Sequence, residues 1–181
     1  MLNPEPSAII VVTGIQASGK STVSRLLAQR FARGVHVEAD ALQRMIVSGG
    51  EGVTEPRPPT GEAAAQLRLR LKNMCLLGRS FAGAGFTAVL DDIILGERWD
   101  QLCEDLAGAP FSVVVLAPSV AAVCRRDANR AKAPLGEEWA RYLDRELRAT
   151  MRGSGLWVDS SGQTPGETVN QIMDRLTDPC L

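Results

Sequence analysis

The stretch AIIVVTGIQASGKS, residues 8–21, decides the fold of this chain. Its first five residues form an unbroken apolar run rich in β-branched side chains, which is typical of a strand covered on both faces. Residues 14–21 match the pattern G-x-x-x-x-G-K-[ST], and apolar residues then recur at helical spacing over residues 21–31. This order of strand, glycine-rich loop and helix predicts a phosphate-binding loop rather than an incidental glycine-rich turn.

The residue types of this loop suit phosphate chemistry. Gly14 and Gly19 let the backbone wrap closely around a phosphate without a Cβ in the way. Main-chain N–H groups from about Gln16 to Ser21 then point inward at a helix N-terminus and form an anion-binding nest. Lys20 adds a positive charge for the β and γ oxygens, and the Ser21 hydroxyl can hold Mg²⁺. The sequence therefore predicts a nucleoside-triphosphate site that contains Gly14, Gln16, Ala17, Ser18, Gly19, Lys20, Ser21 and Thr22.

The rest of the chain continues the alternation of strands and helices. Further strands are predicted at residues 35–38, 86–90, 111–116 and 156–159. Helices are predicted between them, at about 41–47, 62–81, 99–106, 120–130, 137–151 and 166–176. This alternation predicts one α/β domain over residues 1–181, with a parallel sheet between two layers of helices and ligands at the carboxyl ends of the strands.

One long segment, residues 48–61, is rich in Gly, Pro, Glu and Thr and has no periodicity. Its length indicates a mobile loop that could cover a bound substrate as a flap. An insertion without function would look the same.

Composition excludes several classes of protein. Of 181 residues, 45% are hydrophobic and 23% charged, as in ordinary globular domains. Twenty Lys and Arg against twenty-one Asp and Glu give a net charge of −1, which argues against a nucleic-acid partner. No apolar run approaches the ~20 residues that cross a bilayer, and residues 1–6 lack the basic start of a leader peptide. We therefore expect a cytoplasmic protein without a membrane partner, as a monomer or homodimer.

Metal and disulfide frameworks are also disfavoured. The four cysteines are widely spaced and His36 is the sole histidine, so the usual His/Cys zinc site is nearly excluded. Three of the cysteines have apolar neighbours and are interpreted as small buried hydrophobic residues.

Three aspartates follow predicted strands, at the edge where the strand ends converge. Asp40 could accept a proton from an attacking hydroxyl, or cap the helix that follows it. Asp91 and Asp92 close the third strand, as does the acidic residue near Mg²⁺ in phosphoryl-transfer enzymes, although two solvated loop carboxylates would give the same pattern. Because the strand is apolar on both faces, the pattern leaves open which of the two faces the metal.

A basic run at residues 125–132 begins where a helix gives way to a loop. Arg126 and Arg130 are four residues apart and share a helical face. In a lid over about 125–137 they would stabilise charge on the transferring phosphoryl oxygens, the alternative being a solvated charged surface.

Other residues receive weaker interpretations. The turn at 160–165 could pass beside the purine base. Arg68 and Arg70 are interpreted as solvated helix charges, and Trp99, Trp139 and Trp157 as packing residues.

Four parts of the sequence resemble the chloramphenicol phosphotransferase-like family. They are the loop at 14–21, residues 37–40, the stretch LDDIIL at 90–95 with Arg98 and Trp99 beyond it, and the Arg126/Arg130 pair. That family belongs to a wider group of small P-loop kinases that includes gluconate, shikimate and adenylylsulfate kinases, and it is related to the zeta toxins. The resemblance runs from about Ile9 to Val158. It implies the P-loop NTPase fold of nucleoside-monophosphate-kinase type: a three-layer sandwich with a five-stranded parallel sheet of order 2-3-1-4-5 and an arginine-bearing lid.

The same resemblance implies site roles. It implies ATP–Mg²⁺ as phosphoryl donor, Asp40 as the carboxylate that engages the acceptor hydroxyl, and Arg126 and Arg130 as phosphate-binding arginines of the lid. Residues 48–61 show no clear match to chloramphenicol-specific residues, so the acceptor does not transfer with the fold.

The function expected from the sequence is phosphorylation of a small-molecule hydroxyl by ATP, with an antibiotic or other secondary metabolite as one candidate acceptor. The expected catalytic residues are Lys20, Asp40, Arg126 and Arg130, and Arg126 is also expected to contact the nucleotide. The expected metal site consists of Ser21, Asp91 and Asp92. A kinase of a sugar, nucleoside or nucleotide-sugar, zeta-toxin-like chemistry included, is one alternative. A non-catalytic nucleotide-dependent regulator is another, although no Asn-Lys-x-Asp guanine motif is present.

Overall fold

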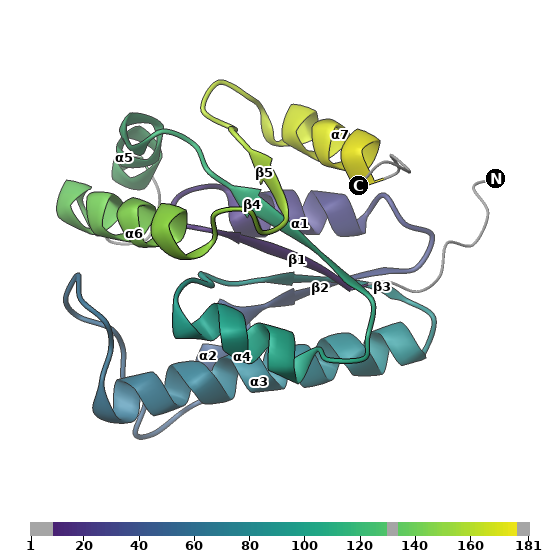
Figure 1. The fold of residues 1–181 in the computed structure, drawn as a ribbon, viewed down its shortest axis with the longest axis horizontal. Helices are drawn as coiled ribbons and strands as arrows, with labels where there is room; N and C mark the ends of the chain where they lie inside the picture. The colour runs from purple at the N-terminus through teal and green to yellow at the C-terminus, as the bar shows by residue number, and fades with distance from the viewer. Residues whose placement is uncertain (1–8, 130–133, 177–181) are drawn as a thin grey trace.

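A parallel sheet of five strands forms the centre of the molecule. The computed structural model describes residues 9–129 and 134–176. The strands are β1 (Ile9–Gly14), β2 (Gly34–Glu38), β3 (Thr87–Asp91), β4 (Phe111–Leu116) and β5 (Leu156–Val158). They lie in the order β2-β3-β1-β4-β5, and every pair is parallel (Figure 1). The predicted sheet and its order are confirmed.

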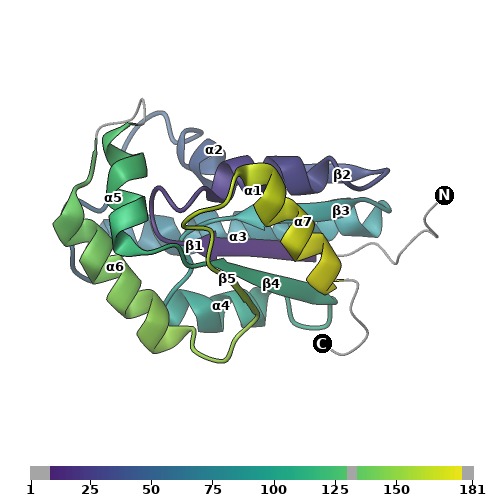
Figure 2. The ribbon, with the colours of Figure 1, turned by 90° about the horizontal axis from the view of Figure 1, so that it is seen from above.

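Helices cover both faces of this sheet, as predicted. They are α1 (Lys20–Ala28), α2 (Ala39–Gln43), α3 (Gly61–Gly83), α4 (Glu97–Asp105), α5 (Val120–Ala128), α6 (Glu137–Thr150) and α7 (Pro165–Leu176). Helices α1 and α7 pack on one face, and α3, α4 and α6 contribute to the core on the other (Figures 1 and 2).

The burial of β1 explains its unbroken apolar run. Ile9 and Val11 belong to the core beneath α3 and α4, whereas Ile10 and Val12 belong to the core beneath α1 and α7. All four side chains are buried, and each contributes about 1.5–3 kcal/mol by leaving water. A central strand of a parallel sheet has no solvent-facing side, so it needs apolar residues at every position.

The cysteine prediction holds best for Cys75. Its side chain is fully buried, and burial raises the pKa of the thiol to about 12. Cys103 and Cys124 are only partly buried, and Cys180 lies outside the described residues.

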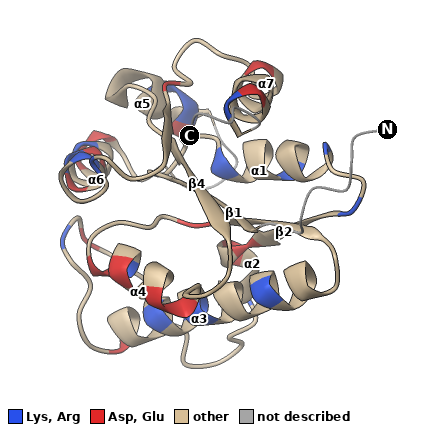
Figure 3. Cartoon of the chain, turned by 45° about the vertical axis from the view of Figure 1, so that its right-hand side comes forward, with Lys and Arg blue, Asp and Glu red and all other residues tan. Residues whose placement is uncertain are grey.

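Three segments converge on the carboxyl ends of the strands, at the left of Figure 1. These are the loop between β1 and α1, the long connection from α2 to α3, and the α5–α6 region. Figure 3 shows acidic and basic residues interspersed along the helices. None of the helices in the described ranges is both long enough and apolar enough to cross a bilayer.

Candidate active site

The loop between β1 and α1 curls back on itself. Ala17 and Gly19 adopt positive φ angles of 53° and 96°, and the Ser18 amide donates a hydrogen bond to the Ile15 carbonyl at 3.3 Å. A Cβ on Gly14 would lie 2.5 Å from the Leu116 carbonyl oxygen, so this position excludes any side chain. The curled backbone at the N-terminus of α1 is the geometry that binds anions.

The side chains around this loop divide into two groups. Lys20 lies over the loop, where its Nζ donates to the Ile15 carbonyl at 2.8 Å. A cavity of about 790 Å³ opens beside it, lined by Gln16, Ala17, Gly19, Lys20, Ser21 and Thr22 among the predicted nucleotide residues. Gly14 and Ser18, two further residues of the loop, are buried and do not line the cavity.

Asp40 lines the same cavity. Helix α2 begins at Ala39 with Glu38 as its N-cap residue, so Asp40 occupies the first turn of the helix. The alternative reading of Asp40 as the helix cap is therefore wrong. The side chain is exposed, and Glu38 and Gln43 line the cavity beside it.

Asp91 and Asp92 face opposite sides of the sheet. Successive strand residues alternate, and Val89 packs beneath α1 and α7 whereas Leu90 packs beneath α3 and α4. Asp91 accordingly lies on the α1 face, where its Oδ2 is 2.9 Å from Nε2 of His36. Both aspartates are at least 95% buried, yet both reach the cavity lining.

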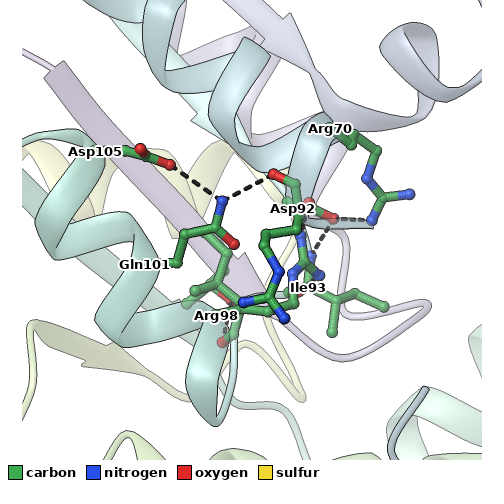
Figure 4. A network of polar contacts seen from close by, with 9 residues as sticks. Arg70, Asp92, Ile93, Arg98, Gln101 and Asp105 are labelled. Atoms are coloured by element: carbon green, nitrogen blue, oxygen red, sulfur yellow. Dashed lines mark hydrogen bonds and ion pairs between the residues drawn. The ribbon is translucent and has the colours of Figure 1, made fainter. Parts of the chain in front are cut away.

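Asp92 is held by two arginines on the other face. Oδ1 accepts a hydrogen bond from Arg70 at 2.7 Å and another from the Ile93 amide at 2.7 Å, while Oδ2 accepts from Arg98 (Figure 4). Arg70 comes from α3 and Arg98 from α4, so the carboxylate connects two helices to the end of β3. The prediction that Arg70 is a solvated charge is wrong, because only 12% of its side chain is exposed. Arg68 is exposed, as predicted.

Arg126 contacts the P-loop itself. From α5, its guanidinium donates to the Ser18 carbonyl at 3.3 Å and to the Ser160 carbonyl at 2.5 Å. The arginine thus ties the nucleotide loop to the turn that follows β5. Arg130 lies outside the described residues.

The turn after β5 is fixed by its own hydrogen bonds. Asp159 accepts from the amide and hydroxyl of Ser161, and these bonds lower the pKa of the Asp159 carboxyl below its usual value. Ser161 Oγ in turn accepts from the Ser119 amide at 2.8 Å, at the start of α5.

The link between α5 and α6 is anchored by Asp127. This buried carboxylate accepts hydrogen bonds from the amides of Leu135 and Gly136 at 2.8 and 3.0 Å. The anchor sets where α6 begins. Leu135, Trp139, Tyr142 and Leu143 then line the cavity from this side.

The segment at 48–61 forms another wall. Glu51, Gly52, Val53, Arg57 and Pro59 line the cavity. The start of the segment is held to α3 by Gln66, whose amide nitrogen donates to the Gly49 carbonyl at 2.7 Å and whose oxygen accepts from the Glu51 amide at 2.8 Å.

Sequence reasoning missed several residues of this cavity. Arg70 is three residues after Leu67 and four before Met74, so helical spacing alone would have put it on the inner face of α3. Trp99, Trp139 and Trp157 all pack against the core as predicted, but Trp139 also lines the cavity. Nothing in the sequence pairs His36 with Asp91, 55 positions away.

The residues present fit a nucleoside triphosphate with Mg²⁺. The curled loop excludes a Cβ at Gly14 and lies at the N-terminus of α1, the geometry that suits phosphate oxygens, and Ser21 and Thr22 are exposed at the start of that helix. Within the described ranges, no three His, Cys, Asp or Glu side chains lie close enough to hold a metal ion by themselves. Mg²⁺ commonly completes its shell with phosphate oxygens and water, so a hydroxyl and one carboxylate suffice here.

Solved structures of several kinases share this fold. A sugar kinase from Janibacter sp. HTCC2649 superposes with a TM-score of 0.70 at 21% identity, over 94% of this chain and 95% of that one. The tunicamycin resistance protein of Deinococcus radiodurans gives a TM-score of 0.69 at 18% identity, over 94% and 96% of the two chains. The APS kinase of Mycobacterium tuberculosis, solved in complex with AMPPNP and APS, gives 0.68 at 18% identity, over 97% and 100%.

No curated protein matches the sequence significantly. A family model described as an AAA domain, AAA_33, matches residues 9–152, which include the loop at 14–21, Asp40, the aspartates 91 and 92 at the end of β3, and α5. The match covers most of the chain, and the fold superposes on the kinase structures over nearly its whole length. The chain therefore belongs to the AAA_33 family, and it shares the fold of these kinase structures.

Proposed function

We propose that this protein is a kinase that transfers the γ-phosphoryl group of ATP to a hydroxyl of a small molecule. The observation that supports this most directly is one cavity whose lining includes Lys20, Ser21 and Asp40. A phosphate-binding loop and a carboxylate that line one cavity of about 790 Å³ are the parts needed for transfer to an acceptor held in that cavity.

Each residue has a proposed role. The amides of residues 16–21 and the Lys20 ammonium hold the phosphates, and Asp40 accepts the proton of the attacking hydroxyl. Arg126 and Arg130 neutralise charge on the phosphoryl oxygens. ATP supplies the phosphoryl group, and Mg²⁺ balances the charge of its phosphates.

For the metal we propose Ser21 and Asp91 rather than Asp92. Asp91 is on the same face of the sheet as α1, which begins with Lys20 and Ser21. Asp92 is on the other face and already neutralises Arg70 and Arg98. A carboxylate between two guanidinium groups is a poor ligand for a further cation, because binding the cation would break those ion pairs.

The acceptor is a small molecule, with an antibiotic or other secondary metabolite as one class. The similarity in fold to a tunicamycin resistance protein is compatible with that class, and so is the similarity to a sugar kinase with a sugar acceptor. The fold does not choose between them.

The test is transfer of labelled phosphate from ATP to a panel of antibiotics, nucleosides and sugars, with Asp40→Asn as the decisive variant and Lys20→Ala as the blank. Loss of a general base costs about 10²–10⁴ in rate, so Asp40→Asn should bind ATP normally and transfer at least about 100-fold more slowly. If Asp40→Asn complements a deletion of the gene as well as the wild type does, phosphoryl transfer is not what the protein contributes, and the chain is a nucleotide-dependent regulator instead.

A further inference from the structure

A surface groove of about 620 Å³ runs between α3 and α4, and the side chains that line it are exposed or half-buried. The groove is separate from the active-site cavity, because no residue lines both. Each of the two helices connects strands that run in the same direction, so α3 and α4 both run antiparallel to the strands and parallel to each other (Figure 1).

The charges of this groove are divided between its two sides (Figure 3). The α3 side carries the basic residues and the α4 side the acidic ones, and they are Arg68 and Lys72 against Glu97, Asp100, Glu104 and Asp105. Among residues 9–129 and 134–176, no ion pair involves any of these six side chains. The groove therefore presents one basic row and one acidic row, and both rows remain available for a partner.

Exposed leucines follow the α3 side of the groove. Leu69 lines the groove and is 51% exposed. Leu76, 55% exposed, is seven residues further on and therefore lies on the same side of the helix. Ala65, one turn before Leu69, also lines the groove. A partner that covers this row of apolar side chains removes them from water.

The division of charge suits a second copy of the same chain. A two-fold axis along the groove sets α3 of one copy on α4 of the other, so that a basic row meets an acidic row twice in one interface. A two-fold axis across the groove would set α3 on α3 and α4 on α4, and like charges would meet. Charge therefore selects the first arrangement.

The register of the two helices supports the same arrangement. Gln101 donates to the Arg68 carbonyl at 2.8 Å and to Asp105 at 3.2 Å, so this part of α4 lies level with Arg68 on α3 (Figure 4). Because the helices run in the same direction, an axis along the groove keeps residues of the two copies at the same height. Arg68 and its neighbour one turn on then meet the acidic residues on either side of Gln101 in the other copy.

We propose that this chain forms a homodimer through the α3–α4 face, defined by the residues that line the groove, with α3 of each protomer on α4 of the other. Leu69 of one protomer packs against Leu69 of the other beside the axis. Helix α3 has 23 residues and is about 34 Å long. A face of one long and one short helix is at the lower end of the ~800 Å² that each partner buries in a stable dimer, so we expect a micromolar Kd. Both active-site cavities stay open, and the proposal does not depend on the proposed function.

Sedimentation equilibrium of the wild type from about 1 to 200 µM provides the first test, because this range spans a micromolar Kd. The mass should rise from the 19.4 kDa of one chain towards twice that value. Raising NaCl from about 50 mM to about 1 M should increase the dimer Kd at least about tenfold, since salt screens the charged rows. A protein that is monomeric throughout, or a dimer that salt does not weaken, would overturn the proposal.

Reversal of each charged row shows which surfaces meet. The basic-row variant is Arg68→Glu with Lys72→Glu, and the acidic-row variant is Asp100→Lys with Glu104→Lys. Each variant alone should dimerise at least about tenfold more weakly than the wild type, because like charges now meet. An equimolar mixture of the two should form a heterodimer, because every altered row then meets a row of opposite sign. A chain with all four changes should dimerise with itself again. Variants that dimerise as the wild type does, or a mixture that stays monomeric, would refute the arrangement.

The control for charge is Arg25→Glu with Arg175→Glu, two exposed positions on α1 and α7, which pack on the other face of the sheet. This variant has the same change in charge as the basic-row variant and should dimerise like the wild type. Leu69→Asp should weaken the dimer, whereas Val47→Asp, at a position that is 95% exposed and outside the groove, should not. If Val47→Asp breaks the dimer and Leu69→Asp does not, the interface lies elsewhere and the proposal is wrong.

ATP binding keeps this proposal apart from the proposed function. All these variants should bind ATP as the wild type does, because the α3–α4 face and the active-site cavity share no lining residue. A wild type that dimerises and binds no ATP would sink the kinase proposal alone. A wild type that binds ATP and stays monomeric would sink the dimer alone.

Discussion

Gly14 is the residue on which the phosphate-binding loop depends most. A Cβ there would lie 2.5 Å from a backbone oxygen of β4 and 2.8 Å from Ser18 Oγ, and neither the strand nor the buried serine can yield easily. Gly14→Ala should therefore lower the free energy of unfolding by at least about 1 kcal/mol and weaken ATP binding at least about tenfold.

The matched control is Gly162→Ala, because a Cβ at Gly162 meets nothing within 4 Å. Urea unfolding and calorimetry with ATP measure the two effects. Equal behaviour of the two variants would mean that the loop has another conformation in solution.

His36 holds the proposed metal carboxylate in place. Its Nε2 lies 2.9 Å from Oδ2 of Asp91, and the imidazole is 17% exposed. Groups that orient a metal ligand typically change metal affinity by 10–100-fold when removed. We expect His36→Ala to raise the Mg²⁺ concentration for half-maximal activity at least about tenfold, with ATP affinity in excess Mg²⁺ little changed.

The contrasting variant is His36→Asn, which keeps a shorter hydrogen-bonding group and should recover part of the Mg²⁺ response. Titration of Mg²⁺ in the transfer assay provides the measurement. If His36→Ala leaves the Mg²⁺ requirement as it is, Asp91 does not hold the metal through this contact.

At the scale of elements, the residues just before α6 are held to α5 by the buried carboxylate of Asp127. Asp127 accepts from the Leu135 and Gly136 amides just before α6 begins, and α6 carries the aromatic wall of the cavity. Asp127→Ala removes both bonds and should destabilise this link by about 1–2 kcal/mol. The exchange of those two amides with solvent should rise about tenfold, and the acceptor KM should rise as Trp139 and Tyr142 lose their fixed position.

Hydrogen exchange read by NMR or mass spectrometry tests this directly. Asn129→Ala is the control, since its side chain bonds only the Arg125 carbonyl among the contacts that the structure gives it, on the exposed side of α5. Unchanged exchange at Leu135 and Gly136 in Asp127→Ala would show that the helix start is held by other contacts.

Some helices and strands could be predicted from the sequence more accurately than others. β1 and its loop were predictable, because a strand buried on both faces and a loop that excludes side chains tolerate few residue types. Local pattern alone gave the alternation of elements, while the strand order came from resemblance to known kinases. Helix α2 was misplaced by two residues at its start, because Ala39 and Asp40 fit a helix or a loop equally well.

Tertiary pairings limited the prediction of the site. Helical spacing could have put Arg70 on the inner face of α3, but nothing in the sequence pairs Arg70 or Arg98 with Asp92, and only the fold brings them together from two helices. Arg126 was predicted as a site residue, but its partners were not: they are the backbone carbonyls of Ser18 and Ser160, 108 and 34 positions away. Backbone acceptors have no sequence signature at all, so such contacts appear only in three dimensions.

At the scale of the whole molecule, the nucleotide site joins both cores. The loop that follows β1 is continuous with α1 on one face, and Arg126 connects it to α5 and to the turn after β5. Binding at this loop should therefore stabilise the domain as one cooperative unit. ATP with Mg²⁺ at 100 times its Kd should add about 2.7 kcal/mol to the free energy of unfolding. For a chain of this length that corresponds to a rise in Tm of roughly 5–10 °C.

Differential scanning calorimetry with and without ATP and Mg²⁺ tests this rise in Tm, and the domain is expected to unfold in a single transition. Lys20→Ala should unfold near the same temperature as the wild type without nucleotide, since its mutation leaves the apolar core intact, and should show little of the ATP-induced rise. Removal of Mg²⁺ by EDTA should cancel part of the rise in the wild type, because the metal balances phosphate charge that Lys20 alone does not neutralise. A wild-type Tm that saturating ATP and Mg²⁺ do not move would mean that the curled loop binds no triphosphate, and the roles assigned to Asp40, Asp91 and Arg126 would lose their basis.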